Sequence, residues 1–173
     1  MNGAEALKAL YALQEKDLEI DRLRAEAESL PEELVALQGQ VETLEERLTN
    51  LLERRAELER EYNRHSLDIE DLSAKEKQAE EEQKRAQSAR EQTQYENRIQ
   101  QIKDRIRELL ELSTPIMEAM ENLEAEIAQV EEELAALRPR LQELLEANRA
   151  RVAELEAAIA AKVEERTAMA AAI

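Results

Sequence analysis

The chain has 173 residues and a formal net charge of −17, and it contains no Trp, no Phe, three Tyr, two Gly and three Pro. So few aromatic and turn-forming residues argue against a compact domain with many reversals, and the abundance of Ala, Glu, Leu, Arg and Gln is typical of long helices or a coiled coil. The acidic charge argues against general binding to the nucleic-acid backbone, and the lack of cysteine excludes disulfides and thiolate metal sites in these residues.

The first 29 residues carry apolar side chains on more than one helical face when wound at 3.6 residues per turn. They are Leu7, Leu10, Tyr11, Leu13, Leu18, Ile20 and Leu23. A second apolar face is either a broad contact within the fold or a docking surface for another domain or subunit, for which Leu7, Leu10, Tyr11 and Leu18 are the candidates. This end lacks the basic start and apolar run of a signal peptide, and no segment approaches the roughly 20 apolar residues of a membrane span. We expect a cytoplasmic protein without membrane contact.

Residues 29–31, Ser-Leu-Pro, interrupt the helical pattern, because proline removes a backbone donor and disfavours helical geometry in the residue before it. Pro31 is followed by two glutamates and also suits the first turn of a new helix. Either a kink or a short break is possible here. The apolar seam continues past Pro31 in phase, which favours the kink.

From Leu34 a heptad pattern predicts a coiled coil. One core position falls at Leu34, Val41, Leu48, Arg55, Tyr62 and Ile69, and the other at Leu37, Leu44, Leu51, Leu58, His65 and Leu72. The pattern stops in Ser73–Gln94, where the only apolar side chains are alanines. We interpret this stretch as the tip of an antiparallel helical hairpin, with a first arm over about 1–85, a tip over about 86–93 and a second arm over about 94–173.

The second arm has an equally regular heptad. One position carries Ile99, Ile106, Ser113, Met120, Ile127, Leu134 and Leu141, and the other Ile102, Leu109, Ile116, Leu123, Val130, Leu137 and Leu144. The phase then shifts to Leu145, Val152, Leu155 and Ile159, an offset that locally unwinds a supercoil. Because Pro139 lies just before this shift, we expect a second kink there.

In an antiparallel hairpin the numbers of facing core residues have a constant sum. A sum of 178 fills every layer, for example Leu58 with Met120 and Leu51 with Ile127, and it places His65 opposite Ser113 as a polar layer that sets the register. A sum of 171, one heptad away, is the nearest alternative. A single His at a core position is more often a packed residue than a metal ligand.

Charge varies along the hairpin. Lys84–Arg107 contains seven basic and three acidic residues, whereas Glu108–Leu137 contains nine glutamates and no basic residue. The candidate tip contacts are Lys84, Arg85, Arg90 and Arg98. These charges either complement the glutamates at 80–82 across the hairpin or contact an acidic protein surface or RNA, although no aromatic platform for stacking bases accompanies them.

Motifs that carry chemistry are missing. The sequence has no phosphate-binding glycine loop, no His pair for a metal and no Ser, His and Asp constellation, and its many carboxylates have no evident cleft that would shift their pKa values. We therefore expect no enzymatic activity and assign no catalytic or metal-binding residue.

The opening residues resemble the start of the bacterial C4-type zinc-ribbon coiled-coil proteins, which have a Leu-Gln-x-x-Asp element, a short helix and a Leu-Pro step. The matching positions are Leu13, Gln14, Asp17, Ile20, Leu23, Leu30 and Pro31. The segment QTQYENRIQQIKDRI is similar to the family's segment after the tip, with Tyr95 and Ile102 seven residues apart. Thr93 and Gln94 replace the family's usual Lys-Glu, and the glycine often found at the tip is absent.

This resemblance implies a long hairpin followed by a C-terminal zinc ribbon with four cysteines, in proteins that serve as interaction modules. Some members resemble regulators of flagellar or secretion-linked gene expression that contact protein partners or nucleic acid. The ribbon is absent from these residues, so zinc is expected only where a ribbon follows residue 173, and any nucleic-acid role that belongs to the ribbon does not transfer to the hairpin.

The sequence therefore favours a non-enzymatic adaptor that binds protein partners as a monomer or weak homodimer. One alternative is a purely structural coiled-coil oligomer. A second is a hairpin factor that inserts its tip into RNA polymerase, which the basic tip residues make less favoured.

Overall fold

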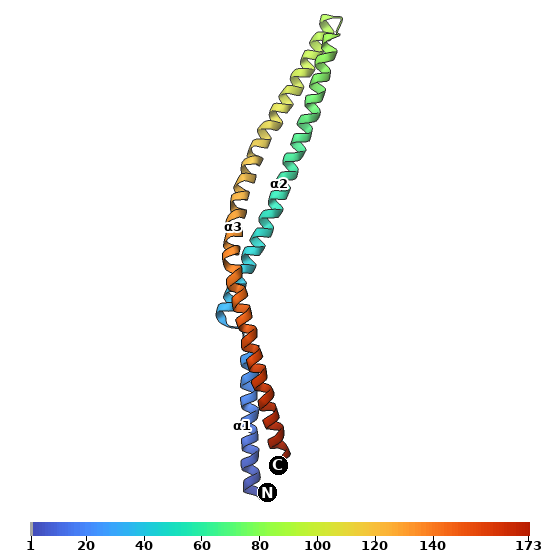
Figure 1. Ribbon diagram of the computed structural model, residues 1–173. Coiled ribbons are helices and arrows are strands. Elements are labelled where there is room, and N and C mark those ends of the chain that lie inside the picture. The colour runs from blue at the N-terminus through green and yellow to red at the C-terminus, as the bar shows by residue number, and fades with distance from the viewer. Residues whose placement is uncertain (1) are drawn as a thin grey trace. The chain divides into compact units, whose positions relative to one another are not determined.

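The computed structural model describes residues 2–173, so only Met1 of the expected first arm lies outside it. Three helices follow one another along the chain: α1 (Gly3–Glu28), α2 (Glu32–Lys84) and α3 (Ala89–Ala171). The fold is all-α, and α2 and α3 pack antiparallel as a hairpin (Figure 1), which confirms the expected class. Two compact units can be described separately: unit 1 contains residues up to Thr43 and from Leu134 onward, and unit 2 contains Leu44–Glu133.

In unit 1, α1 and the first turns of α2 lie against the C-terminal part of α3. The N- and C-termini meet at the same end of this unit (Figure 1). The buried apolar residues of the unit are Ile20, Leu34, Leu37, Val41 and Leu134. Leu134 is fully buried, whereas the residues that continue the seam after the phase shift, such as Val152 and Ile159, are only half-buried.

The interruption expected near Pro31 is a three-residue break between two helices rather than a kink in a continuous helix. The backbone at Ser29 is extended and its N–H donates to the Ala25 carbonyl at 3.1 Å, which ends α1. The N–H of Val35 donates to the Pro31 carbonyl at 3.1 Å, and Glu32 and Glu33 occupy the first turn of α2, where negative charge is favourable. Helix α3 continues through Pro139, and the bend expected there stays a prediction.

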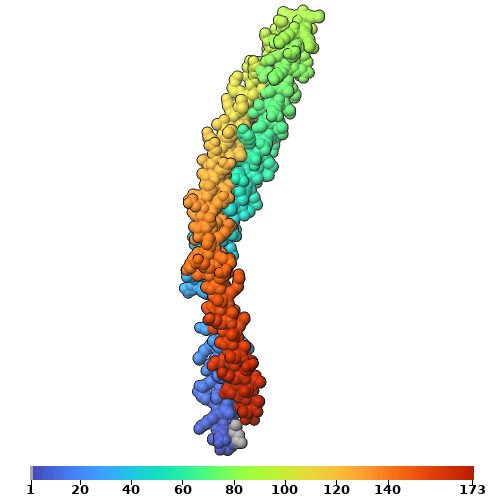
Figure 2. Space-filling model, viewed as in Figure 1, coloured from blue at the N-terminus to red at the C-terminus, as the bar shows by residue number. Residues whose placement is uncertain are grey.

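In unit 2, the heptad pattern correctly identified the residues that face the partner helix. All the core positions predicted on α2 and α3 within this unit are buried or half-buried, including the polar Arg55, His65 and Ser113. In the space-filling view the side chains of α2 and α3 abut along the visible face of the unit (Figure 2). Long helices of this kind are held mainly by burial of one apolar face, because helical propensity alone contributes little.

The register of unit 2 follows the expected pairing closely. Lys103 Nζ lies 3.9 Å from Glu76 Oε1 across the hairpin, and the two residue numbers add up to 179. With the alternative sum of 171, Glu76 would instead face residue 95, eight residues or about 12 Å from Lys103 along the helix. Near the tip, Gln83 Nε2 donates to the Gln92 carbonyl at 3.5 Å.

The reversal between α2 and α3 occupies residues 85–88, a few residues before the expected tip over about 86–93. The sequence Ser88-Ala-Arg-Glu91 has the Ser-x-x-Glu pattern of a capping box, with Ser88 as the cap, and begins α3 early. Ser88 Oγ accepts a hydrogen bond from the Glu91 N–H at 3.1 Å, and Glu91 Oε2 accepts one from the Gln87 N–H at 3.2 Å. The backbone makes this reversal without any residue at positive φ, which explains why the tip needs no glycine.

Candidate functional site

The apolar residues predicted on the second face of α1 all lie in solvent. Leu7, Leu10, Tyr11 and Leu18 are 70%, 50%, 64% and 49% exposed, and their spacing of three, four and seven residues places them on one side of the helix. We call these four residues the α1 stripe. The opposite side of α1, with Leu13 and Leu23 half-buried and Ile20 buried, packs on α3. A contiguous exposed apolar stripe is typical of an interaction surface.

Ion pairs and hydrogen bonds fix α1 on α3. Lys16 Nζ donates to Glu165 Oε2 at 2.8 Å, Lys162 Nζ lies 3.3 Å from Glu19 Oε2, and Arg166 Nε donates to Asp17 Oδ1 at 3.0 Å. The hydrogen bond from Lys16 lowers the pKa of Glu165 below its ordinary value, and the one from Lys162 does the same for the pKa of Glu19. The hydrogen bond to Glu165 raises the pKa of Lys16. These contacts orient the helix so that the α1 stripe faces outward.

Arg151 of α3 holds the C-terminal end of α1. Its Nη1 donates to the Glu26 carbonyl at 2.9 Å and its Nη2 donates to the Ser29 carbonyl at 2.7 Å. Asn148 Oδ1 accepts from the same guanidinium at 3.0 Å and orients it. The last carbonyls of a helix lack partners within the helix and carry partial negative charge, so a guanidinium is well suited to this position.

The four basic residues predicted at the tip are all exposed. Lys84 is on the last turn of α2 and lies 4.0 Å from Glu81 of the same helix, with its side chain 76% exposed. Among the described residues, Arg85, Arg90 and Arg98 make no ion pair with a carboxylate. The complementarity to the glutamates at 80–82 that the sequence suggested is thus limited to Lys84 and its own helix. The other three guanidinium groups face solvent.

His65 and Ser113, the predicted polar layer, are both at least half-buried but are not joined by a hydrogen bond. The Ser113 hydroxyl donates to the Leu109 carbonyl of its own helix at 2.8 Å. His65 Nε2 lies 3.9 Å from Glu61, and His65 Nδ1 is buried without a hydrogen-bond partner. The role of these two residues in setting the register stays a prediction.

Nothing in residues 2–173 assembles a metal centre or a bilayer-spanning segment. No group of three or more His, Asp or Glu side chains comes together in a geometry suited to a metal ion in this range. None of the helices described combines the length and apolar character needed to cross a membrane.

Comparison with known proteins gives a consistent result. The family model described as the CT398-like coiled coil hairpin domain matches residues 13–173. A solved structure from Mycobacterium smegmatis is similar to the chain at 25% identity with a TM-score of 0.77, covering 96% of this chain and 70% of the other. The HP0958 protein from Helicobacter pylori is similar in fold, at 16% identity with a TM-score of 0.68, covering 98% of this chain and 72% of the other. No curated protein matches the sequence.

Proposed function

Because the chain belongs to the family of CT398-like coiled coil hairpin domains, we propose that it is a non-enzymatic adaptor, in which a helical hairpin presents surfaces to protein partners. The observation that carries this proposal is the α1 stripe, with four large apolar side chains 49–70% exposed on a helix held in place by ion pairs. A purely structural hairpin has no need to keep such residues in solvent, where they cost solubility.

The chemistry of α1 indicates the kind of surface that covers the stripe. Between Gly3 and Leu18 the charged residues are three acidic and two basic, so this part of the helix is nearly neutral on a strongly acidic chain. A nearly neutral apolar stripe is suited to an apolar patch on a folded protein and lacks the concentration of positive charge that binds a phosphate backbone. Burial of aromatic and leucine side chains would then supply most of the binding energy.

A zinc ribbon is the second part of the proposal. The resemblance of the opening residues and of the segment after the tip to the C4-type zinc-ribbon family supports a ribbon with four cysteines after Ile173, and contacts with nucleic acid in gene regulation or secretion would belong to it. The zinc content and mass of the natural protein test this part. A zinc-free natural protein without such a segment would contradict it.

The adaptor proposal is tested by crosslinking. A photo-crosslinking amino acid is placed at Leu7 or Tyr11, and at exposed Leu30 as a matched control. The adaptor model requires one defined partner crosslinked from Leu7 and Tyr11, and binding of that purified partner at least tenfold weaker for the Leu7→Ser/Tyr11→Ser variant. Crosslinks only to a second copy of the chain, with a stable dimer by light scattering, would favour the structural oligomer instead.

The tip supports a second candidate surface, because Arg85, Arg90 and Arg98 are exposed and unpaired among the described residues. These charges are suited to an acidic protein surface. Replacing all three with Gln should then weaken capture of the same partner, and should do so more strongly at low salt because exposed charges are screened by ions. Unchanged binding would leave the tip as a simple connection between the two helices.

A further inference from the structure

A groove lies between α2 and α3 on one face of unit 2. It consists of two neighbouring hollows of about 390 and 220 Å³ that share Tyr62 and Met117. On the α3 side, Leu110 and Met117 are 53% and 47% exposed, and on the α2 side Tyr62 and Ile69 are half-buried. Since the two hollows share walls, they form one continuous apolar groove.

Small polar residues open this groove. Ser113 occupies a core position that carries large apolar residues one heptad before and one heptad after it, and Ser66 and Thr114 line the same hollow. Their side chains are too short to fill the space between two helices at normal packing density. Because the Ser113 hydroxyl already donates its hydrogen bond to the Leu109 carbonyl, it does not require a polar partner from a molecule bound in the groove.

The spacing of the apolar walls matches a helix. Tyr62 and Ile69 are seven residues apart on α2, and Leu110 and Met117 are seven residues apart on α3. Seven helical residues span about 10.5 Å, the repeat with which a third helix presents its own apolar residues to a coiled coil. An extended strand returns to the same face every 6.6 Å or so and would lose this register.

The edges of the groove are acidic. Glu70, Glu121 and Glu124 line the two hollows and are exposed, and between Glu108 and Glu133 the α3 sequence contains nine glutamates and no basic residue. Arg60 and Arg64 of α2 line neither hollow. A second copy of this groove would bring like charges together, and nucleic acid would be repelled for the same reason. A cationic partner is the complementary one.

We propose that this groove binds a basic amphipathic α-helix of a protein partner. Apolar side chains of that helix at heptad spacing lie between Leu110 and Met117 on one side and Tyr62 and Ile69 on the other, while its Lys and Arg side chains lie beside the glutamates. The walls from Leu110 to Glu124 span about 21 Å of α3, enough for roughly four turns of the bound helix. The groove in unit 2 is thus a partner surface that shares no residue with the α1 stripe.

The probe is a fluorescein-labelled peptide of three heptads, with Leu and Ile at two positions of each heptad and mainly Lys and Arg elsewhere. One control peptide has the same composition in scrambled order, and a second has Glu in place of every Lys and Arg. Binding to the 173-residue chain is measured by fluorescence anisotropy at physiological salt. The basic amphipathic peptide should bind at least tenfold more tightly than either control.

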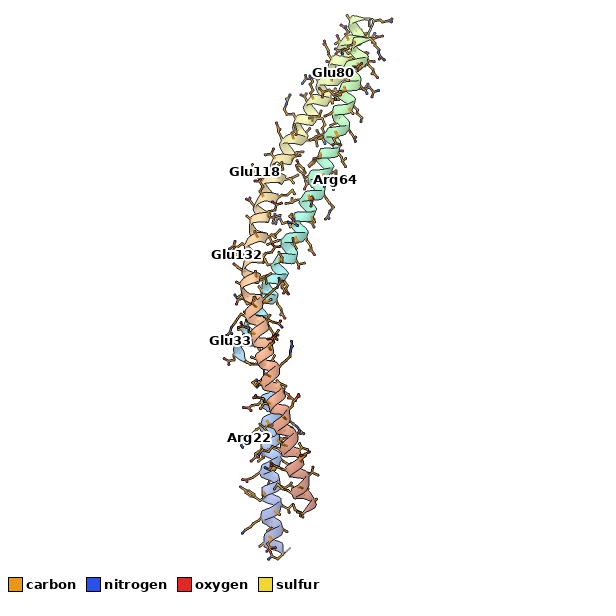
Figure 3. All side chains as sticks on the ribbon, viewed as in Figure 1. Arg22, Glu33, Arg64, Glu80, Glu118 and Glu132 are labelled. Atoms are coloured by element: carbon orange, nitrogen blue, oxygen red, sulfur yellow. The ribbon has the colours of Figure 1, made fainter. Side chains whose placement is uncertain are left out.

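Matched protein variants locate the binding site. Met117→Lys should weaken binding by tenfold or more, whereas Leu112→Lys, a similar change at a residue 49% exposed on the same helix that lines neither hollow, should change it less than twofold. Glu121→Lys should weaken binding in the same way. Glu118→Lys is its control, because Glu118 lies on the side of α3 away from α2 (Figure 3). Circular dichroism checks that every variant is still helical.

Each other outcome decides against the proposal. Equal binding of the scrambled peptide, or equal losses in the Leu112→Lys and Glu118→Lys controls, would show that charge alone attracts the peptide. No peptide binding, together with a dimer that Met117→Lys dissociates, would assign the groove to a second copy of the chain. The Leu7→Ser/Tyr11→Ser variant should bind the peptide normally, so the proposal for the groove and the proposal for the α1 stripe can be contradicted separately.

Discussion

Replacing Arg151 with Met should release the C-terminal end of α1 while leaving unit 2 unchanged. The variant keeps most of the aliphatic stem but loses the donors to the Glu26 and Ser29 carbonyls, at 2.9 and 2.7 Å. Hydrogen bonds from charged groups contribute about 1.5–3 kcal/mol each when buried. Arg151 is only half-buried and water can replace the lost donors, so we expect a combined loss of about 1–2 kcal/mol.

Amide hydrogen exchange measures this loss directly. The N–H of Ser29, bonded to the Ala25 carbonyl, and the amides in the last turn of α1 should exchange about 5–30 times faster in the Arg151→Met variant. Arg149→Met, an equivalent change at an exposed arginine two residues away, should change them less than twofold. Arg151→Lys should give an intermediate result, because an ammonium group cannot reach two carbonyls as a planar guanidinium does.

Two results would refute this reasoning. Unchanged exchange in the last turn of α1 would mean that the two carbonyls are satisfied equally well by water. Equal acceleration in unit 2 would mean that Arg151 acts on global stability rather than on the end of one helix.

Four further predictions test other contacts. Hydrogen bonds from lysines lower the pKa values of Glu19 and Glu165. The contribution of these ion pairs to α1 docking should therefore be full above pH 4.5 and be lost as the pH falls through the lowered pKa values. The loss should appear as faster amide exchange in α1, after correction for the intrinsic exchange rates. Ser88→Ala should cost about 1 kcal/mol at the start of α3 and accelerate exchange in its first turn. Leu134→Ala, at a fully buried position, should lower the unfolding free energy in urea by about 2–5 kcal/mol. His65→Leu should raise the unfolding free energy by about 1 kcal/mol, because it removes a buried nitrogen without a hydrogen-bond partner.

Contrary outcomes are equally specific. Protection of α1 that is constant between pH 6 and pH 3 would show that the lysine pairs do not hold the helix. A loss in Leu134→Ala no larger than in Leu112→Ala, at an exposed position, would contradict the assigned core. Destabilisation by His65→Leu would mean that a bound water or a rearranged ring satisfies the histidine.

The core of the hairpin could be predicted from the sequence because a heptad repeat fixes which residues of a helix face a partner. Each predicted seam residue on α2 and α3, from Leu34 to Leu144, is buried or half-buried. The second apolar face of α1 was also predictable, since Leu7, Tyr11 and Leu18 fall off the seam by helical geometry alone, whereas the sequence left open whether this face packs within the fold or faces solvent.

Features that depend on residues far apart in sequence were harder to predict. The apolar seam continues in phase past Pro31 and therefore gives no sign of the break. The break is stabilised by Arg151, which bonds the Ser29 carbonyl although the two residues are 122 apart in sequence. Helix α3 starts earlier than the lack of large apolar residues in Ser73–Gln94 suggests, because Ser88 caps it by accepting from the Glu91 N–H. Ser113 could be recognised as unusual, but the groove around it required knowing that Ser66 and Thr114 line the same space.

From loop-closure entropy we expect α1 to pair with the last part of α3 after the hairpin has formed at its tip. The contact between Gln83 and Gln92 joins residues nine apart, whereas Lys16 and Glu165 are 149 apart. The longer loop exceeds the shorter one by about four doublings of length, and each doubling adds about 0.6 kcal/mol to the entropic cost of closure, about 2.4 kcal/mol in all. The hairpin should therefore form at its tip and extend toward the termini.

During synthesis on the ribosome, α1 is therefore the first helix to be made and the last to pack against its partner, the C-terminal part of α3. At 5–20 residues per second, the 149 residues from Lys16 to Glu165 take about 7–30 s to synthesise. During this time Leu13, Ile20 and Leu23 have no partner from α3. Ile20 is the one buried residue of the finished α1, so the helix leaves little apolar surface without its native partner during this time.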